Sequence, residues 1–292
     1  MTSMRERFYA LTREALDADE RVAVVTAQIG ADAIGEHPRH FDVGIREQLM
    51  IGVAAGLAME GYRPITHSYT PFVVERPYEF LKLDLGHNDL GAVVVSTGAS
   101  YDAARSGRTH QAPEDVALVA ALPGWTIHVP GHAGELDELF RSALRGDGRV
   151  YVRLSEEANH ARVDGGGGFT VIRRGPAGAP LVVAVGPTLA PVLEATVGRD
   201  FTVAYLATVR PFPHRSLRDA LADAAEVVLV EPYLAGTSAA EIAIALRDRP
   251  HRLLALGVPN AEFRHYGSGA EHRAAHGLDV PGIARSLEEF LG

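Results

Sequence analysis

Apolar residues recur with two different spacings along the first half of the chain. Residues 3–18 carry apolar side chains at helical spacing (Met4, Phe8, Leu11 and Ala15), whereas residues 21–27 form a short β-branched run typical of a buried strand. The same reasoning predicts helices over residues 47–61, 72–87, 113–124 and 134–146, and strands over residues 63–69, 91–98, 125–131 and 149–155. Pro77 lies inside one of these helices and predicts a kink or a restart there.

This alternation of strands and helices predicts an α/β fold. Strands that are apolar throughout indicate a parallel sheet covered by helices on both faces, with ligands bound outside the carboxyl ends of the strands. Residues 161–179 include four consecutive glycines and are predicted to be a linker with room for one short strand. We therefore expect two doubly wound domains: residues 1–160, with a parallel sheet, and residues 180–292, where the α/β pattern continues.

The composition narrows the class of protein. The 292 residues carry 28 Lys+Arg against 37 Asp+Glu, a net charge of −9 that argues against general nucleic-acid binding. The absence of cysteine excludes disulfides, thiolate metal sites and cysteine nucleophiles. The charged N-terminus lacks the apolar core of a signal peptide, and no apolar run reaches the roughly 18 residues of a membrane span. We expect a cytoplasmic protein.

One carboxylate stands out from this pattern. Glu47 precedes the small, apolar run of residues 48–59, which reads as a buried helix. The residue is either a surface cap favoured by the helix dipole or a buried acid that faces a partner inside the protein. Taken alone, the position favours the cap.

Longer segments point to a family. Residues 41–64, 68–72 and 106–131 resemble the pyrimidine-binding domain of the transketolase family, and residues 209–213, 231–246 and 257–279 resemble its C-terminal domain. The segments occur in the family's order and span essentially the whole chain. The resemblance implies a thiamine-diphosphate-dependent transferase that moves a two-carbon ketol unit between ketose and aldose substrates.

The resemblance covers only the C-terminal part of a full-length member. The family's diphosphate domain binds Mg²⁺ through a Gly-Asp-Gly…Asn motif, whereas "GDG" occurs here once, at 146–148, without a suitable Asn. The chain therefore resembles the smaller subunit of a split transketolase. Its activity is expected to need a separate subunit that holds the diphosphate and Mg²⁺. The apolar helix 47–61 is expected to pack against its twin, giving a homodimeric core in an α2β2 heterotetramer.

The resemblance also assigns roles to residues near the cofactor. Glu47 matches the glutamate that bonds the N1′ nitrogen of the pyrimidine and favours its imino tautomer. Phe72 matches the aromatic residue that stacks on the pyrimidine, and Tyr69 is a second candidate. Gln28 replaces an acidic cofactor-pocket residue, and His110 matches a histidine that faces the substrate and can move a proton.

The predicted substrate site departs from the family pattern. Ser106 stands where many members have an aspartate that contacts a sugar hydroxyl, and Glu156 stands where phosphosugar-using members have an arginine. A bidentate arginine is the expected grip on phosphate, which a carboxylate would repel. Arg153, Arg105 and Arg108 are the candidates to compensate. We expect a non-standard substrate that is unphosphorylated, differently phosphorylated or amine-bearing.

Two alternatives remain open at this point. One is a decarboxylating relative, such as the β subunit of a 2-oxoacid dehydrogenase or a synthase of the deoxyxylulose-phosphate type. The other is a non-catalytic assembly subunit. No metal site is expected on this chain, because His265, His272 and His276 lack compact ligand spacing and are expected to be solvated. His67 is a further candidate to reach the pocket.

Overall fold

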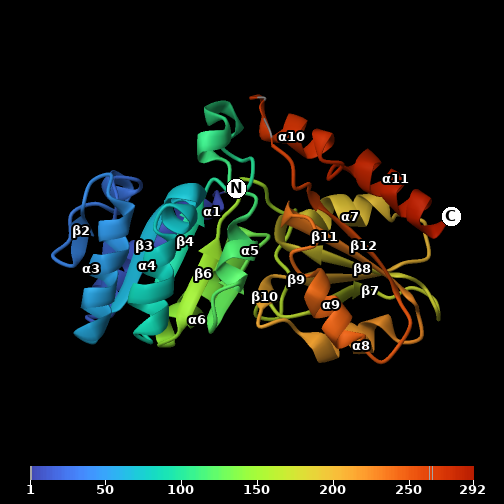
Figure 1. Cartoon of the computed structure of the whole chain (residues 1–292), viewed down its shortest axis with the longest axis horizontal. Helices are drawn as coiled ribbons and strands as arrows, with labels where there is room; N and C mark the ends of the chain where they lie inside the picture. Colours follow the sequence, from blue (N-terminus) through green and yellow to red (C-terminus); the bar gives the residue numbers. More distant parts are fainter. Residues whose placement is uncertain (1, 263, 265) are drawn as a thin grey trace.

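Two α/β units lie side by side in the computed structural model, which describes residues 2–262, 264 and 266–292 (Figure 1). The first sheet has seven strands in the order β10-β5-β6-β4-β3-β1-β2, and the second has five in the order β12-β11-β8-β9-β7. The predicted α/β fold with two sheet-forming units is confirmed.

Six strands of the first sheet come from the first half of the chain and pair in parallel: β1 (Val22–Thr26), β2 (His40–Asp42), β3 (Arg63–Tyr69), β4 (Val93–Thr97), β5 (Trp125–His128) and β6 (Arg149–Arg153). Most of them are buried on both faces, which explains their unbroken apolar sequences. The edge strand β2 was not predicted, because its three residues are partly exposed and carry no apolar pattern.

Helices cover both faces of this sheet: α1 (Met4–Ala18), α2 (Ala31–Ile34), α3 (Glu47–Met59), α4 (Tyr78–Phe80), α5 (Asp115–Ala120) and α6 (Ala133–Arg145). Phe8 of α1 and Phe140 of α6 pack in one apolar cluster with strand residues such as Val93. Met50 of α3 and Val116 of α5 belong to the cluster on the opposite face.

The helix predicted over residues 72–87 is interrupted as expected. It consists of a π-helical turn at Pro71–Glu75, the short α4, and a second π-helical turn at Leu81–His87. Pro77 occupies the N-cap of α4, so the restart lies at the proline, which cannot donate a backbone hydrogen bond. π-helical turns of this kind are frequent at functional sites.

The second unit contains strands β7 (Thr170–Arg173), β8 (Leu181–Val185), β9 (Thr202–Leu206), β11 (Glu226–Leu234) and β12 (Arg252–Val258), and helices α7 (Leu189–Ala195), α8 (His214–Leu221), α9 (Ala239–Ala245), α10 (Gly269–Ala275) and α11 (Val280–Leu291). Figure 1 shows α8 and α9 on one side of the sheet and α7 and α11 on the other. β7 lies inside the glycine-rich segment 161–179 and pairs antiparallel with β9. No helix within the described residues is both long and apolar enough to cross a membrane.

One strand of the second half joins the first sheet. The run over residues 201–213, predicted as a single strand and a turn, divides into β9 and β10 (Thr208–Arg210), and β10 pairs antiparallel with β5. The apolar core is also shared, since Trp125 of the first unit and Phe212 and Tyr233 of the second belong to one buried cluster. The two units therefore pack through a common core.

A buried ion pair lies at this junction. Arg153, at the end of β6, donates to Asp115 at the start of α5 over 2.7 Å, and their side chains are 1% and 0% exposed. Tyr151 donates to the same carboxylate oxygen over 2.7 Å. Arg153 also donates to the Ser100 hydroxyl over 2.6 Å, and this hydroxyl donates to the carbonyl of Pro232 in β11 over 2.6 Å. The network thus links the first unit to the second.

His67 is a core residue, so the interpretation that it reaches the pocket is wrong. It lies in β3 under α1, with its ring 4.7 Å from that of Phe8. Its Nδ1 donates to the Val95 carbonyl over 3.0 Å, so Nε2 accepts from the Tyr9 hydroxyl over 3.2 Å. Burial lowers the pKa of His67 to about 3, because the interior disfavours the charged imidazolium.

The ion pair predicts a large loss of stability in Asp115→Asn. The variant leaves the Arg153 guanidinium buried without its counter-charge, which typically costs about 3–5 kcal/mol in the free energy of unfolding. Chemical denaturation measures the loss. The matched control is Asp248→Asn, which breaks the exposed pair with Arg218 and is expected to change stability little. A loss below about 1 kcal/mol for Asp115→Asn would contradict the assigned role.

The buried imidazole predicts a stability that falls in acid. Unfolded His67 binds a proton below its ordinary pKa of 6.5, whereas the folded residue resists protonation down to about 3. The parent should therefore lose about 2 kcal/mol from this group at roughly pH 5, and His67→Gln should lack that part of the pH dependence. Denaturation curves between pH values of about 7 and 5 test this, with the exposed His87→Gln as the control. Identical slopes for His67→Gln and the parent would refute it.

Candidate functional site

Glu47 is a buried acid at the first position of α3, so it is not a surface cap. Its side chain is 2% exposed, although the helix start that carries it is open to solvent at Arg46. Within the described residues its carboxylate receives one hydrogen bond, from Arg76 Nη1 over 2.7 Å. The N-terminal dipole of α3 further stabilises the negative charge.

Three rings gather beside this carboxylate. Phe72 lies in the π-helical turn after β3, Tyr69 ends β3, and His110 comes from the loop after β4. The ring centroids of Phe72 and His110 are 5.0 Å apart, those of Tyr69 and His110 are 5.5 Å apart, and those of Tyr69 and Phe72 are 6.2 Å apart, all edge to face. The structure thus brings together three residues that were predicted from sequence, and we call these three rings the aromatic cluster.

Arg76 shows that a planar nitrogen group fits between Glu47 and Phe72. Its guanidinium carbon lies 4.1 Å from the Phe72 ring centroid while one N–H donates to Glu47. A flat heterocycle with a protonated nitrogen can make the same stacking contact and the same hydrogen bond. Arg76 is 40% exposed, so the guanidinium has solvent to move into. The residues present therefore fit an aminopyrimidine ring.

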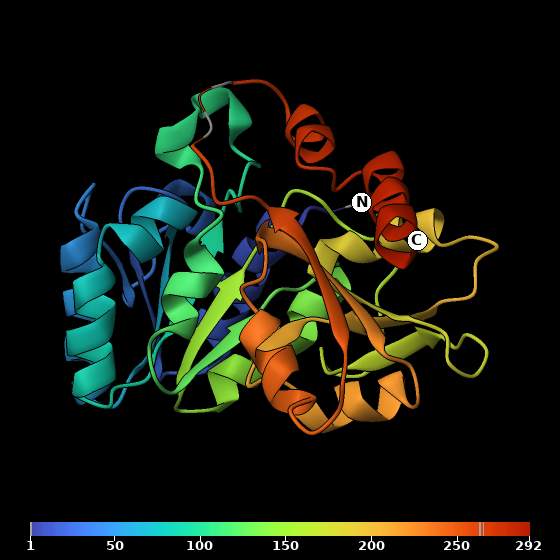
Figure 2. The same ribbon diagram turned by 45° about the vertical axis from the view of Figure 1, so that its right-hand side comes forward.

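The loop that carries His110 is held from both units. It forms two 3₁₀ turns, Ala104–Ser106 and Arg108–His110, separated by Gly107 at a φ of 72°. A Cβ at Gly107 would lie 2.6 Å from the Tyr266 ring, which shows how closely the second unit approaches this loop (Figure 2). Thr109 Oγ1 lies 2.9 Å from His110 Nδ1, which leaves Nε2 as the nitrogen available to a ligand.

Gln28 lies in the turn after β1. It adopts a left-handed φ of 70° and is exposed, and its backbone N–H donates to Asp42 Oδ1 over 2.7 Å. Asp42 also accepts from the Thr26 hydroxyl over 3.2 Å, so the turn is well fixed. In the described part of the chain, no hydrogen bond or ring contact joins Gln28 to Glu47 or Phe72.

A cavity of about 410 Å³ adjoins the aromatic cluster and lies between the two units. Tyr69 lines it, together with residues 102–106, Glu156 and residues 267–269. Ser106 and Glu156, both predicted from sequence to be near substrate, are therefore at the same cavity. We call this space the distal cavity.

Asp102 is a lining residue that sequence reasoning missed. Its carboxylate accepts from the Glu156 N–H over 2.8 Å and from the Ser155 hydroxyl over 3.3 Å. Burial raises the pKa of Asp102 to about 7; the Glu156 N–H opposes the shift and the nearby Glu157 carboxylate adds to it. The one available signal was its place after a strand that ends at the ligand-binding edge.

The three arginines proposed to compensate for Glu156 lie in different settings. Arg153 is committed to the buried pair with Asp115 and does not line the distal cavity. Arg108 pairs with Glu114 over 2.7 Å and with Glu262 over 3.7 Å. Arg105 does line the cavity and is exposed. Of the three, Arg105 is therefore the one placed to meet a ligand there.

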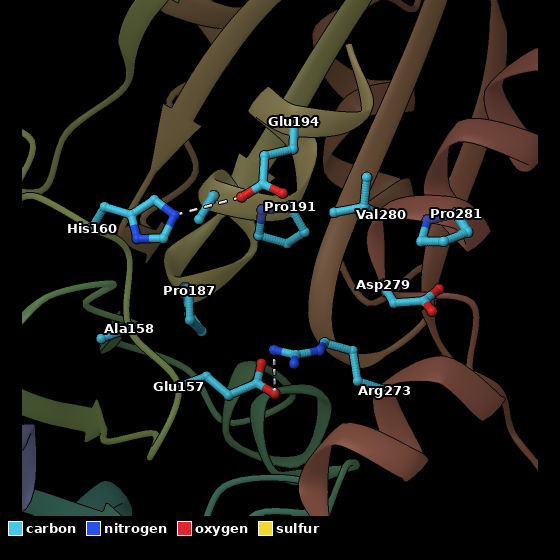
Figure 3. Close-up of a pocket in the computed structure, with 11 residues that line it drawn as sticks. Glu157, Ala158, His160, Pro187, Pro191, Glu194, Arg273, Asp279, Val280 and Pro281 are labelled. Atoms are coloured by element: carbon cyan, nitrogen blue, oxygen red, sulfur yellow. Dashed lines mark hydrogen bonds and ion pairs between the residues drawn. The ribbon is translucent and has the colours of Figure 1, made fainter. Parts of the chain in front are cut away.

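A second cavity, of about 420 Å³, lies beside α7 and α11 (Figure 3). Two ion pairs cross its walls, Glu157 with Arg273 over 2.9 Å and His160 with Glu194 over 3.5 Å. It contains none of the site residues predicted from sequence. We therefore assign the candidate site to the distal cavity and the aromatic cluster.

The histidine group near the C-terminus is not solvated as expected. His272 is 1% exposed and stacks on Tyr101 with centroids 5.8 Å apart, because α10 packs its inner face against the first unit. His276 lies 5.4 Å from the same ring, and His265 lies outside the described residues. Among the described residues, no group of three or more His, Asp or Glu side chains is arranged to hold a metal ion.

Comparison with known proteins identifies the family. Residues 3–160 match the model of the transketolase pyrimidine-binding domain. The chain is 47% identical, over its whole length and 96% of the relative, to an uncharacterized 33.6 kDa protein in the fasciation locus of Rhodococcoides fascians. It is 30% identical, over 96% of its length and 94% of the relative, to one of the subunits of the apulose-4-phosphate transketolase of Actinobacillus succinogenes.

The fold agrees with this assignment. A solved structure described as "Split gene transketolase, inactive beta4 tetramer" superposes with a TM-score of 0.86 at 24% identity, covering 100% of this chain and 99% of that one. At that identity the match speaks for the fold, and the resemblance noted in the sequence is confirmed by the family match. The chain therefore belongs to the transketolase family, through a pyrimidine-binding domain like that of the split enzymes' smaller subunits.

Proposed function

We propose that this chain is the pyrimidine-side subunit of a thiamine-diphosphate-dependent, transketolase-like enzyme that transfers a two-carbon ketol unit. A separate subunit holds the diphosphate and Mg²⁺ and completes the active site in an α2β2 assembly. The observation that carries the proposal is the buried Glu47 carboxylate beside the face of Phe72. The near full-length similarity to the apulose-4-phosphate transketolase chain supports it.

The residues of this chain bind and orient the pyrimidine half of the cofactor. When bound, thiamine diphosphate supplies the carbon nucleophile that carries the ketol unit. Glu47 accepts a hydrogen bond from a ring nitrogen and holds the ring in the required tautomer. Phe72 and Tyr69 provide the aromatic surface, and Gln28 lines the same edge of the sheet. Arg76 leaves the face of Phe72 and turns to solvent.

His110 is the proton carrier in this proposal. Because Thr109 lies 2.9 Å from Nδ1, the Nε2 atom holds or releases the proton at the oxygen of the substrate's reacting carbon. The ring packs edge to face on Phe72, which keeps Nε2 beside the place where the cofactor ring binds. Ser106 and Glu156 line the distal cavity, where the rest of a non-standard substrate would lie.

The outer face of α3 is the proposed contact with a second copy. Ile45, Leu49 and Met59 are 67%, 48% and 72% exposed along this helix and its lead-in, and Gly56 lies between them without a side chain. An apolar strip of this size on one helix is typical of a protein interface. Two copies would form the homodimeric core, with one partner subunit on each side.

The role of Glu47 predicts loss of turnover in Glu47→Gln. The amide keeps the shape of the side chain but lacks the negative charge, so turnover by the assembled pair should fall about 100-fold or more. Calorimetry with thiamine diphosphate measures cofactor binding separately. The matched control is Glu60→Gln, an exposed glutamate at the end of the same helix, which should retain parental activity.

The alternatives are distinguished by the same assay. Turnover of Glu47→Gln within about threefold of the parent would contradict the proposal and favour a non-catalytic assembly subunit. Release of carbon dioxide from a 2-oxoacid, without transfer of a ketol unit from any ketose, would favour a decarboxylating enzyme.

The apolar face of α3 predicts that Leu49→Glu weakens self-association. A charge at the centre of a desolvated contact is costly, so the variant should sediment closer to the 31.2 kDa monomer than the parent does. Val197→Glu is the matched control, because Val197 is 71% exposed but belongs to the second unit. An unchanged mass for Leu49→Glu, with parental stability, would place the interface elsewhere.

A further inference from the structure

The distal cavity carries more negative than positive charge. Asp102 and Glu156 contribute carboxylates from opposite sides, and Arg105 contributes the one guanidinium among the described lining residues. Asp102 is fixed in place by hydrogen bonds from the segment that holds Glu156, so the two acids form one unit. This excess of acceptor groups is unusual for a space that would receive an anion.

The surrounding positive charges do not reverse this balance. Arg153 is buried and committed to Asp115, and Arg273 pairs with Glu157 at the second cavity. The first turn of α10, which borders the distal cavity at Ser268, is already capped: the Ser268 N–H donates to Glu271 over 2.8 Å. The part of the chain that the structure describes therefore offers a phosphate neither a second guanidinium nor an open set of backbone N–H groups there.

We propose that Asp102 and Glu156 determine substrate choice, by binding hydrogen-bond donors on the end of the substrate remote from its reacting carbonyl and by disfavouring phosphate there. The donors are hydroxyl or ammonium groups, and both suit two carboxylates. The inference rests on the proposed function, because it needs the reacting carbon to lie at the aromatic cluster. Tyr69 belongs to both the cluster and the cavity wall, which makes the two spaces continuous.

The test compares acceptors that differ only at the remote end, using the assembled pair and one fixed ketose donor. The acceptors are D-erythrose, D-erythrose 4-phosphate and a four-carbon aldose with a terminal amine. The parent should prefer the free aldose or the amine over the phosphate by about tenfold or more in kcat/KM. A greater preference for the amine identifies an ammonium as the donor, and equal rates identify a hydroxyl.

Variants locate this preference in the two acids. Asp102→Asn and Glu156→Gln should each raise KM for the preferred acceptor about three- to tenfold with little change in kcat, since they act on binding away from the reacting carbon. Glu156→Arg should shift the preference toward the phosphate. Glu194→Gln, an exposed acid at the second cavity, is the matched control and should leave KM unchanged. Thermal melts show whether each variant is folded.

Two results would overturn the inference. One is a parent that prefers the phosphate, with Arg105→Gln abolishing the preference, because Arg105 would then grip an anion. The other is a folded Glu156→Arg variant with parental acceptor ratios. Failure of the proposed function looks different: no acceptor would turn over. In that case, calorimetric binding of the same three aldoses to the assembled pair still tests the selectivity of Asp102 and Glu156.

Discussion

The buried ion pair between Arg153 and Asp115 organises the molecule. An isolated guanidinium or carboxylate is costly to bury, and here each is satisfied by the other and by Tyr151 and Ser100. Ser100 in turn bonds to Pro232 of the second sheet. The pair thereby sets how the two units meet. It also fixes the start of the loop that leads to His110.

The candidate site depends on this arrangement at two points. The His110 loop begins at Ser100, which has a left-handed φ of 48°, and is covered near Gly107 by Tyr266 from the second unit. The distal cavity exists because residues 267–269 of the second unit face residues 102–106 of the first. A pyrimidine-binding sheet alone would present Glu47 and Phe72, but it would lack one wall of the substrate space.

The predictable parts of the fold are those in which local sequence and final environment agree. β3 occupies residues 63–69 as predicted, and Pro77 marks the restart of the interrupted helix. β2, β7 and β10 were harder. β2 has no apolar pattern, β7 lies among glycines, and β10 continues the run of β9 but pairs with β5 across the junction. Propensity indicates that such a run is extended, but not which sheet it joins.

The amino-acid sequence by itself determined the family, the position of Glu47 at the head of an apolar helix, and the candidates Phe72, Tyr69 and His110, because each of these is carried by a contiguous motif. Only the tertiary structure decided which arginine is buried and which lines the cavity, and that Asp102 faces Glu156. The physical reason is that burial and pairing of a charge depend on residues distant in the chain. Arg153 and Arg105 look equivalent in sequence, yet one has its partner in Asp115 and the other faces open space.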